Sequence, residues 1–372
     1  MTDELAERLL AKVMGWGLEA VRSHLPTIPA LAAWKYDTYE RFTHGMRFVE
    51  SLALWLDQFE TNEERQVAFD FIRNRLVFFS EPEMNHLVEM AYPDFIRPYL
   101  LQRVAEESYQ PPRQPGTLAG QAEFLARQRR CLFLGLSDGA RTDVFRRSNC
   151  PDLTNEQFLL TYEVEEGRAA KLLAALRKGL NQIAGFNFSE EDVRFRTVVL
   201  LDDFSASGKS YLRLDGEQHV GKIGGFYRNL FKNESGTSAL FNPSKLDLLL
   251  LLYAGTKQAR DHLEEHMDKL WSPTPGIRWK VIIVHELDND LRLSRGAGDP
   301  MEALVEKYYD PAIQDEHTDV GGTEDVKYGF ADCGLPIVLP HNAPNNSIAL
   351  LWAETNERRA LFPRVQRHRR QS

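Results

Sequence analysis

Two adjacent aspartates, Asp202 and Asp203, directly follow the mostly apolar run RTVVLL at residues 196–201. The run predicts a buried strand, and the small residues after the aspartates allow backbone N–H groups to close around a phosphate at the start of a helix. Paired carboxylates repel a phosphate, so they are better suited to accept hydrogen bonds from sugar hydroxyls or to meet a magnesium ion. The predicted phosphate-binding residues are Ser205, Ala206, Ser207, Gly208, Lys209 and Ser210.

The end of this segment, Gly208-Lys209-Ser210, also matches the end of a Walker A loop, Gly-x-x-x-x-Gly-Lys-[Ser/Thr]. The first glycine of that pattern falls on Asp203, whose carboxylate strains the turn and opposes phosphates. A degenerate P-loop NTPase is therefore kept only as a minor alternative. An ordinary strand-to-helix turn is another, although two aspartates with three serines and a glycine are unusual in a simple connection.

A second polar loop follows an earlier apolar run at residues 131–136. Gly139 in this loop permits close backbone approach, and Arg141 can neutralise a diphosphate. A plain turn explains the loop equally well. The predicted diphosphate-binding residues are Ser137, Asp138, Gly139 and Arg141.

A third polar segment, PHNAPNNS at residues 340–347, follows a short apolar run. His341 is a candidate acid or base, and the asparagines are candidates for hydrogen bonding to a nucleobase or another acceptor. A rigid turn is the alternative, but a turn does not require the histidine. The predicted acceptor-binding residues are Asn342, Asn345 and Asn346.

The apolar runs after residue 120 are continuous rather than alternating, which favours strands covered on both faces in a parallel α/β sheet. Ligands of such sheets bind beyond the carboxyl ends of the strands, where the polar loops above lie. Before residue 110 the apolar spacing is helical. The predicted parts are a helical N-terminal domain at 1–112, an α/β domain at 120–355 and a basic tail at 356–372, with a boundary at the segment PPRQPG of residues 111–116.

The composition and charge of the chain argue against several classes of protein. The chain has 372 residues, 43% of them hydrophobic, which excludes disorder as its main state. A net charge of −9 argues against non-specific coating of nucleic acid, although the arginine-rich tail can form a local patch or a disordered end. Three cysteines without CxxC spacing support neither a disulfide framework nor a zinc ribbon. Without an apolar run of spanning length or a signal peptide, we expect a cytoplasmic protein that does not enter a membrane.

Two further patterns have open interpretations. His262, Glu265 and His266 fit the His-x-x-Glu-His pattern of a zinc protease, but their charge-rich surroundings favour a solvated helix face. The segment KIGGFYR at residues 222–228 is either a glycine-hinged flap over the site or an ordered surface loop.

Residues 198–210 resemble the ribose-phosphate loop of the type I phosphoribosyltransferases, which has an apolar strand, two acids and a loop of small residues. Together with residues 137–143 and 340–347, they resemble a divergent branch of phosphoribosyltransferase-like proteins from bacterial conflict systems, some encoded beside retron reverse transcriptases. The resemblance covers about residues 120–355. Lys209 and the insertion at 211–242 depart from the salvage enzymes of the family, which puts ordinary salvage chemistry in doubt.

This resemblance implies a type I phosphoribosyltransferase-like domain that binds 5-phosphoribosyl diphosphate or a nucleotide and acts at the sugar C1. Asp202 and Asp203 would bind the ribose hydroxyls, residues 205–210 the phosphate, and Mg²⁺ would bridge ribose and diphosphate oxygens. No side chain is assigned to the metal except Asp203 as a candidate. The implied process is anti-phage defence, with the N-terminal helices docking protein or nucleoprotein partners. The alternative is a non-catalytic nucleotide sensor or scaffold that retains the phosphate pocket.

Overall fold

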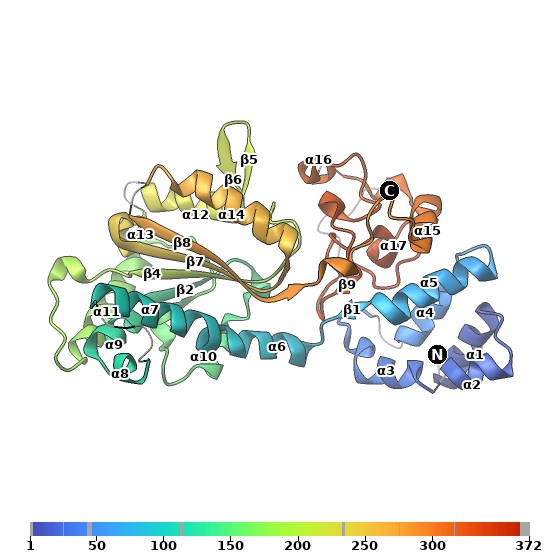
Figure 1. The fold of residues 1–372 in the computed structure, drawn as a ribbon, viewed down its shortest axis with the longest axis horizontal. Helices are drawn as coiled ribbons and strands as arrows, with labels where there is room; N and C mark the ends of the chain where they lie inside the picture. Colours follow the sequence, from blue (N-terminus) through green and yellow to red (C-terminus); the bar gives the residue numbers. More distant parts are fainter. Residues whose placement is uncertain are drawn as a thin grey trace. The chain divides into compact units, whose positions relative to one another are not determined.

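The computed structural model describes residues 3–24, 26–42, 47–109, 111, 115–232, 235–274, 276–315 and 317–364. The chain forms two compact units. Unit 1 consists of residues Met1–Glu83 and Asp288–Ser372, and unit 2 consists of residues Met84–Leu287. Figure 1 shows the chain coloured along its sequence.

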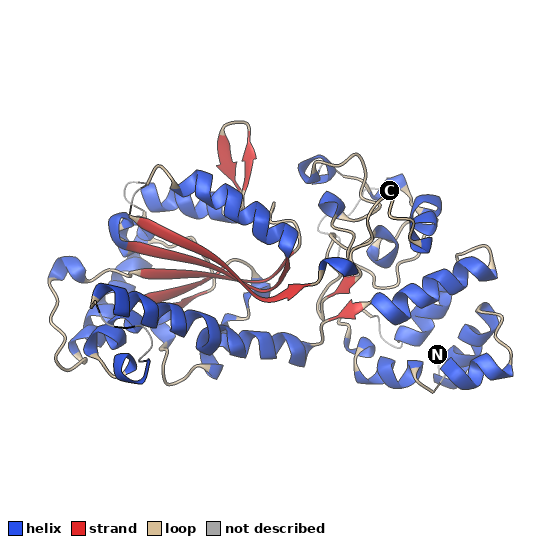
Figure 2. Cartoon of the chain, in the orientation of Figure 1, coloured by secondary structure: helices blue, strands red, loops and turns tan. Residues whose placement is uncertain are grey.

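Unit 2 is built on a five-stranded parallel sheet, shown in red in Figure 2. If the five strands are numbered in chain order, their order across the sheet is 2-1-3-4-5. The direction of winding therefore reverses between the first and third strands, which are neighbours in the sheet. The predicted mixed α/β architecture with a parallel sheet is therefore present. The strands, from one edge to the other, are β3 (Phe158–Leu159), β2 (Cys131–Gly135), β4 (Thr197–Ser205), β7 (Leu246–Thr256) and β8 (Ile277–Leu287).

Helices with one apolar face bury the leucine-rich strands of unit 2. Helix α11 (Glu166–Asn181), for example, turns Leu172, Leu176 and Leu180 into the same hydrophobic core as Leu200 of β4. The capping side chain of Thr256 accepts a hydrogen bond of 3.1 Å from Ala259 N and begins α14 directly after β7. The other helices and short strands of unit 2 are α7 (Arg97–Glu107), α8 (Pro115–Ala119), α9 (Ala122–Arg129), α10 (Thr142–Ser148), β5 (Arg213–Asp215), β6 (Gln218–Val220), α12 (Lys222–Phe231), α13 (Gly236–Leu240) and α14 (Lys257–Trp271), while α6 (Glu81–Met90) begins in unit 1.

Unit 1 combines the first helices of the chain with its last segment. Trp55 Nε1 donates to Leu350 O at 2.8 Å, and Ser51 Oγ donates to Leu361 O at 2.7 Å. The ring of Phe362 stacks on Phe48 with centroids 5.7 Å apart. Unit 1 contains α1 (Asp3–Val13), α2 (Leu18–His24), α3 (Ile28–Trp34), α4 (Phe48–Leu56), α5 (Asn62–Arg75), β1 (Val77–Phe78), α15 (Pro300–Tyr308), α16 (His317–Gly321), β9 (Ile337–Val338) and α17 (Ala349–Trp352).

These units differ from the predicted domains. The N-terminal helices share one hydrophobic core with residues near 300–362, so they do not form a separate core of their own. The composition break at residues 111–116 lies inside unit 2, and its residues 112–114 are outside the described part. Of the predicted tail, residues 365–372 also lie outside the described part. A run of prolines marks a loop, whereas a domain is defined by contacts that local composition does not record.

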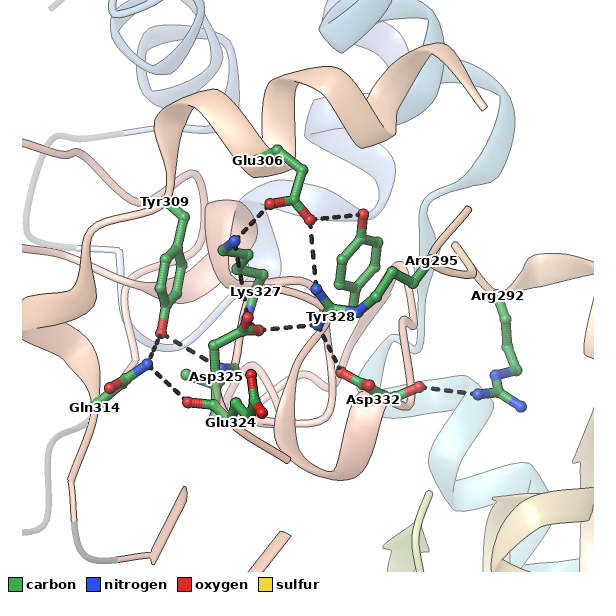
Figure 3. Close-up of polar contacts among 11 residues, drawn as sticks. Arg292, Arg295, Glu306, Tyr309, Gln314, Glu324, Asp325, Lys327, Tyr328 and Asp332 are labelled. Atoms are coloured by element: carbon green, nitrogen blue, oxygen red, sulfur yellow. Dashed lines mark hydrogen bonds and ion pairs between the residues drawn. The ribbon is translucent and has the colours of Figure 1, made fainter. Parts of the chain in front are cut away.

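A polar network in unit 1 supports a turn with unusual backbone geometry (Figure 3). Ala331 and Asp332 adopt φ angles of 59° and 48°, which non-glycine residues rarely do. Arg292 donates from Nη2 to Asp332 O at 2.9 Å and from Nε to Cys333 O at 3.1 Å. The Arg295 guanidinium bridges the carboxylates of Asp325 and Asp332 at 3.1 and 3.4 Å. These contacts hold the strained turn in place.

Within the described residues, no helix combines the length and the apolar character needed to cross a bilayer.

A buried ion cluster supports the amino end of the sheet in unit 2. Asp247, at the start of β7, is fully buried and pairs with Arg127, which is also buried. Arg278 Nη2 lies 2.6 Å and Arg103 Nε 3.4 Å from the same carboxylate. Glu106 and Glu107 complete the cluster, since both pair with Arg103 and Glu107 also pairs with Arg127.

Replacing Asp247 by Asn should lower the free energy of unfolding by about 3–5 kcal/mol, because buried Arg127 loses its buried counter-charge and keeps only the partly exposed Glu107. Chemical denaturation of both proteins at pH 7 measures the loss. Asp261→Asn is the matched control, since its 2.6 Å pair with Lys257 is exposed and should contribute little. Equal losses in the two variants would contradict this assignment.

Candidate functional site

The two aspartates predicted to bind a sugar lie at the carboxyl end of β4, the central strand of the sheet. The neighbouring loop of residues 137–141 follows β2, which pairs with β4 in parallel register. Both loops therefore meet where the winding direction of the sheet reverses, the position at which open α/β sheets form ligand crevices. The structure brings together two of the three predicted polar segments.

Asp202 is almost completely buried, with 1% of its surface exposed. Its Oδ2 accepts from Tyr211 OH at 2.8 Å and lies 2.5 Å from Lys222 Nζ. Its Oδ1 accepts from Ser137 Oγ and from the backbone N–H of Asp203. These partners compensate the charge of the carboxylate and use both of its oxygens. A role for Asp202 in binding a sugar stays a prediction.

Asp203 is the more exposed carboxylate of the pair. Its Oδ1 accepts from Phe204 N at 2.8 Å, and a Cβ atom at Gly139 would collide with its carboxylate. Burial and the negative charge of Asp202 raise the pKa of Asp203 to about 7. Because residue 139 is a glycine, the loop of residues 137–141 can approach the Asp203 carboxylate closely.

The predicted phosphate loop is a tight turn stabilised by its own serines. Ser205 Oγ accepts from Gly208 N at 3.1 Å, and Ser207 Oγ accepts from Lys209 N at 3.4 Å. Thr256 Oγ1 donates to Ala206 O at 2.6 Å, which joins the turn to the end of β7. Gly208 has φ of 73°, where a side chain is disfavoured.

The helix predicted to start near Ser210 is absent. The chain makes one turn, in which Tyr211 and Leu212 donate to Gly208 O, and then enters the β5–β6 hairpin. The hydroxyl of Tyr211 is held by Asp202 and Phe204 O, which draws the chain back over β4. A phosphate here would be bound by loop N–H groups and Lys209 without the dipole of a following helix.

The predicted diphosphate loop contains a short helical turn, η3 (Asp138–Ala140). Ser137 Oγ accepts from Gly139 N at 3.2 Å, and Tyr253 OH donates to Ala140 O at 2.6 Å. Arg141 adopts a left-handed φ of 46°, and its Nη1 donates to Asn85 Oδ1 at 3.2 Å. The contact of Ser137 with Asp202 links this loop to the aspartate pair.

His341 and the three predicted acceptor-binding asparagines belong to unit 1, so the site described in unit 2 contains none of them. Asn346 Nδ2 donates to Phe330 O at 3.2 Å, and Asn345 O accepts from Phe330 N at 2.7 Å. The backbone of His341 accepts from Arg41 Nε at 3.0 Å. These contacts order a turn of unit 1, and a role for His341 and Asn342 in catalysis or acceptor binding stays a prediction.

The His-x-x-Glu-His pattern forms one face of helix α14. His262 Nε2 donates to Leu212 O at 2.8 Å, and His266 Nδ1 contacts the helix carbonyl of His262 at 3.0 Å. Among the described residues, no group of three or more His, Cys, Asp or Glu side chains is arranged to hold a metal ion. His262 and His266 are both half-buried, and each imidazole contacts a backbone carbonyl.

The segment at residues 222–228 is neither a flap nor a surface loop. It forms the first turns of α12, whose side chains Ile223, Phe226 and Leu230 are buried in the core of unit 2. The helix also brings Lys222 to Asp202, a contact that sequence reasoning missed. The available signal was the apolar spacing at 223, 226 and 230, which is helical.

The structure is that of an α/β protein whose two polar loops follow the first and third strands of a parallel sheet. The PRTase-CE family model matches residues 52–364, and the chain belongs to this family of phosphoribosyltransferase-like proteins of conflict systems. The resemblance seen in the sequence is thereby confirmed, and the match extends into the N-terminal helices. No curated protein and no solved structure matches the chain.

The raised pKa of Asp203 predicts a pH-dependent effect of Asp203→Asn on stability. Its carboxyl has an ordinary pKa of 3.8 in the unfolded chain, so between about pH 4 and about pH 7 the folded state binds more protons than the unfolded state. Stability contributed by this group therefore falls as the pH rises through that window. The variant should have a higher melting temperature than the wild type at pH 8, with a gain that shrinks toward pH 4.5.

Thermal unfolding at pH 4.5, 6, 7 and 8 measures this difference. Asp215→Asn, which removes a charge from the exposed β5–β6 hairpin, is the matched control. A gain for Asp203→Asn that does not vary with pH would show that the carboxyl is not the titrating group.

Proposed function

We propose that the chain is a phosphoribosyltransferase-like enzyme that binds 5-phosphoribosyl diphosphate or a nucleotide in unit 2 and acts at the sugar C1. The observation that carries this proposal is the position of Asp203. It is a partly exposed carboxylate at the carboxyl end of the central strand, with a close approach by Gly139 on one side and the turn of residues 205–210 on the other. Family membership supports the same class of ligand.

Each part of the site has a proposed role in that reaction. Asp203 accepts hydrogen bonds from the ribose hydroxyls, while loop N–H groups and Lys209 bind the 5′-phosphate. Arg141 and the backbone of residues 137–139 orient the diphosphate. The C1–O bond breaks with its electron pair leaving on the diphosphate, and the acceptor atom forms the new bond to C1 and gives up its proton.

We propose that Mg²⁺ binds this site only together with the phosphoribosyl ligand. Lys222, Tyr211 and Ser137 contact Asp202, whereas Asp203 is the more exposed carboxylate of the pair. Mg²⁺ is commonly bound through one or two carboxylates together with substrate phosphates. We therefore propose that Asp203 and the ligand oxygens hold it. When bound, it would offset negative charge on the leaving group.

For the biological process, we propose an effector role in anti-phage defence, which the conflict-system family supports. Partners of protein or nucleoprotein type would dock on the N-terminal helices. Two large apolar side chains there are unusually exposed, Leu18 at 80% and Trp34 at 72%. A cytoplasmic location would be consistent with that role.

A non-catalytic sensor or scaffold is the second candidate. The observation that favours it is the neutralised state of Asp202, whose ion pair with Lys222 leaves one carboxylate instead of two for the sugar. Such a protein would bind the phosphoribosyl ligand but show no turnover.

Asp203→Asn should abolish binding of 5-phosphoribosyl diphosphate, because the amide loses the negative charge that favours hydroxyl donors and Mg²⁺. Thermal stabilisation of the wild type by ligand at about 100 times its dissociation constant should correspond to about 2.7 kcal/mol and disappear in the variant. The panel contains 5-phosphoribosyl diphosphate, ribose 5-phosphate, nucleoside monophosphates, ATP and NAD, with and without Mg²⁺, and Asp215→Asn is the matched control.

Three other outcomes would change the assignment. Stabilisation by ATP alone, lost in Lys209→Ala, would support the P-loop NTPase. Binding of the phosphoribosyl ligand without release of diphosphate, tested across nucleobase and amine acceptors, would support the sensor. No stabilisation by any member of the panel would contradict the proposed ligand class and favour a scaffold.

A further inference from the structure

The loop of residues 137–141 is attached to two neighbouring strands of the sheet in unit 2. Its first half is held by β4, because Ser137 Oγ donates to the Asp202 carboxylate. Its second half is held by β7, because Tyr253 OH donates to Ala140 O at 2.6 Å. The position of this loop therefore depends on a tyrosine that is distant from it in the sequence.

Tyr253 lies beside the aspartate pair. Its two chain neighbours pair with Asp202 and Phe204 of β4, so Tyr253 lies opposite Asp203, and both side chains project from the same face of the sheet. The tyrosine is completely buried. Burial and the negative charges of Asp202 and Asp203 raise the pKa of Tyr253 well above its usual value, so its hydroxyl stays a hydrogen-bond donor.

The hydrogen bond from Tyr253 fixes the peptide group that precedes Arg141. The carbonyl of Ala140 and the N–H of Arg141 belong to one planar unit. Arg141 has φ of 46°, a left-handed conformation that is unfavourable for a residue with a Cβ atom. A bond that holds the plane of the preceding peptide therefore also sets the direction in which the Arg141 side chain leaves the loop.

A buried carbonyl needs a hydrogen-bond donor, and this need alone would give Tyr253 a role in stability only. Two features connect its bond with the candidate site. Ala140 follows Gly139, whose backbone lies against the Asp203 carboxylate. Ala140 also precedes Arg141, the residue proposed to orient a diphosphate. The hydroxyl of Tyr253 thus acts at the centre of the loop that would contact this part of the ligand.

We propose that Tyr253 is a positioning residue, which makes the site prefer a sugar phosphate that carries a diphosphate at C1 over the same sugar phosphate without it. This inference rests on the proposed function. Acting through Ala140 O, Tyr253 keeps the loop of residues 137–141 against Asp203. A loop that already has its binding conformation loses less conformational entropy when the ligand binds, so the gain falls on the part of the ligand that the loop contacts.

Thr256, also on β7, makes the corresponding contact to the other loop. Its Oγ1 donates to Ala206 O at 2.6 Å, within the turn proposed to bind the 5′-phosphate. That phosphate is present in the ligand with and without the diphosphate. Two separate hydroxyl groups of one strand therefore hold the two loops, and their effects on binding can be distinguished.

The test compares the dissociation constants of ribose 5-phosphate and 5-phosphoribosyl diphosphate, measured by calorimetric titration with Mg²⁺. Their ratio reports the contribution of the diphosphate. Tyr253→Phe removes only the hydroxyl and should lower this ratio about fivefold or more, the change expected when one hydrogen bond to a buried carbonyl is lost. The affinity for ribose 5-phosphate should stay unchanged. Because both constants describe binding, the test applies equally to an enzyme and to a sensor.

Thr256→Val should weaken the binding of both ligands and leave their ratio unchanged. The matched control is Tyr92→Phe, which removes another buried tyrosine hydroxyl of unit 2, the acceptor of a hydrogen bond from Gln128. This control should lower the melting temperature without changing the ratio. Without ligand, hydrogen–deuterium exchange at residues 139–142 should be faster in Tyr253→Phe than in the wild type and in Tyr92→Phe.

The outcomes separate this proposal from the proposed function. If the wild type binds both ligands and Tyr253→Phe leaves their ratio unchanged, the role of Tyr253 is overturned and the proposed function stands. An equal fall of the ratio in Tyr92→Phe or Thr256→Val would also overturn that role, because it would show a general loosening of unit 2. Failure of the wild type to bind either ligand would contradict the proposed function itself, together with the preference assigned to Tyr253.

Discussion

The buried carboxylate of Asp202 holds together the parts of unit 2 on which the candidate site depends. It receives Ser137 from the loop after β2, Tyr211 from the turn after β4, and Lys222 from the start of α12. An unpaired carboxylate at this depth would be strongly unfavourable, so these three contacts stabilise one another through it. The two adjacent aspartates therefore have different surroundings, since Asp202 is almost completely buried and Asp203 is partly exposed.

The two ends of the sheet in unit 2 have opposite electrostatic character. Two aspartates lie at the carboxyl end of β4, where burial and the negative charge of Asp202 raise the pKa of Asp203 to about 7. Arginines surround the amino end, where Asp247 pairs with Arg103, Arg127 and Arg278. At that end, Nε and Nη2 of Arg130 have no hydrogen-bond partner among the described residues.

Two separated segments of the chain form unit 1, so the N-terminal helices do not make up a unit by themselves. Ser51 and Trp55 of α4 donate to carbonyls of the C-terminal segment, and β1 pairs with β9. The N-terminal helices are thus part of a core completed by residues after 288. The family match from residue 52 to residue 364 includes parts of both segments.

The sequence by itself determined the parallel α/β sheet and the polar loops after β2 and β4, because continuous apolar runs and the small, acidic residues that follow them are local properties. The family was also recognisable from these residues. Only the tertiary structure decided that Lys222 pairs with Asp202, because Lys222 lies twenty residues away in the chain. The same holds for the division into two units and for the turn that replaces a helix after Ser210. Each depends on contacts between distant segments, and local propensity carries no record of those contacts.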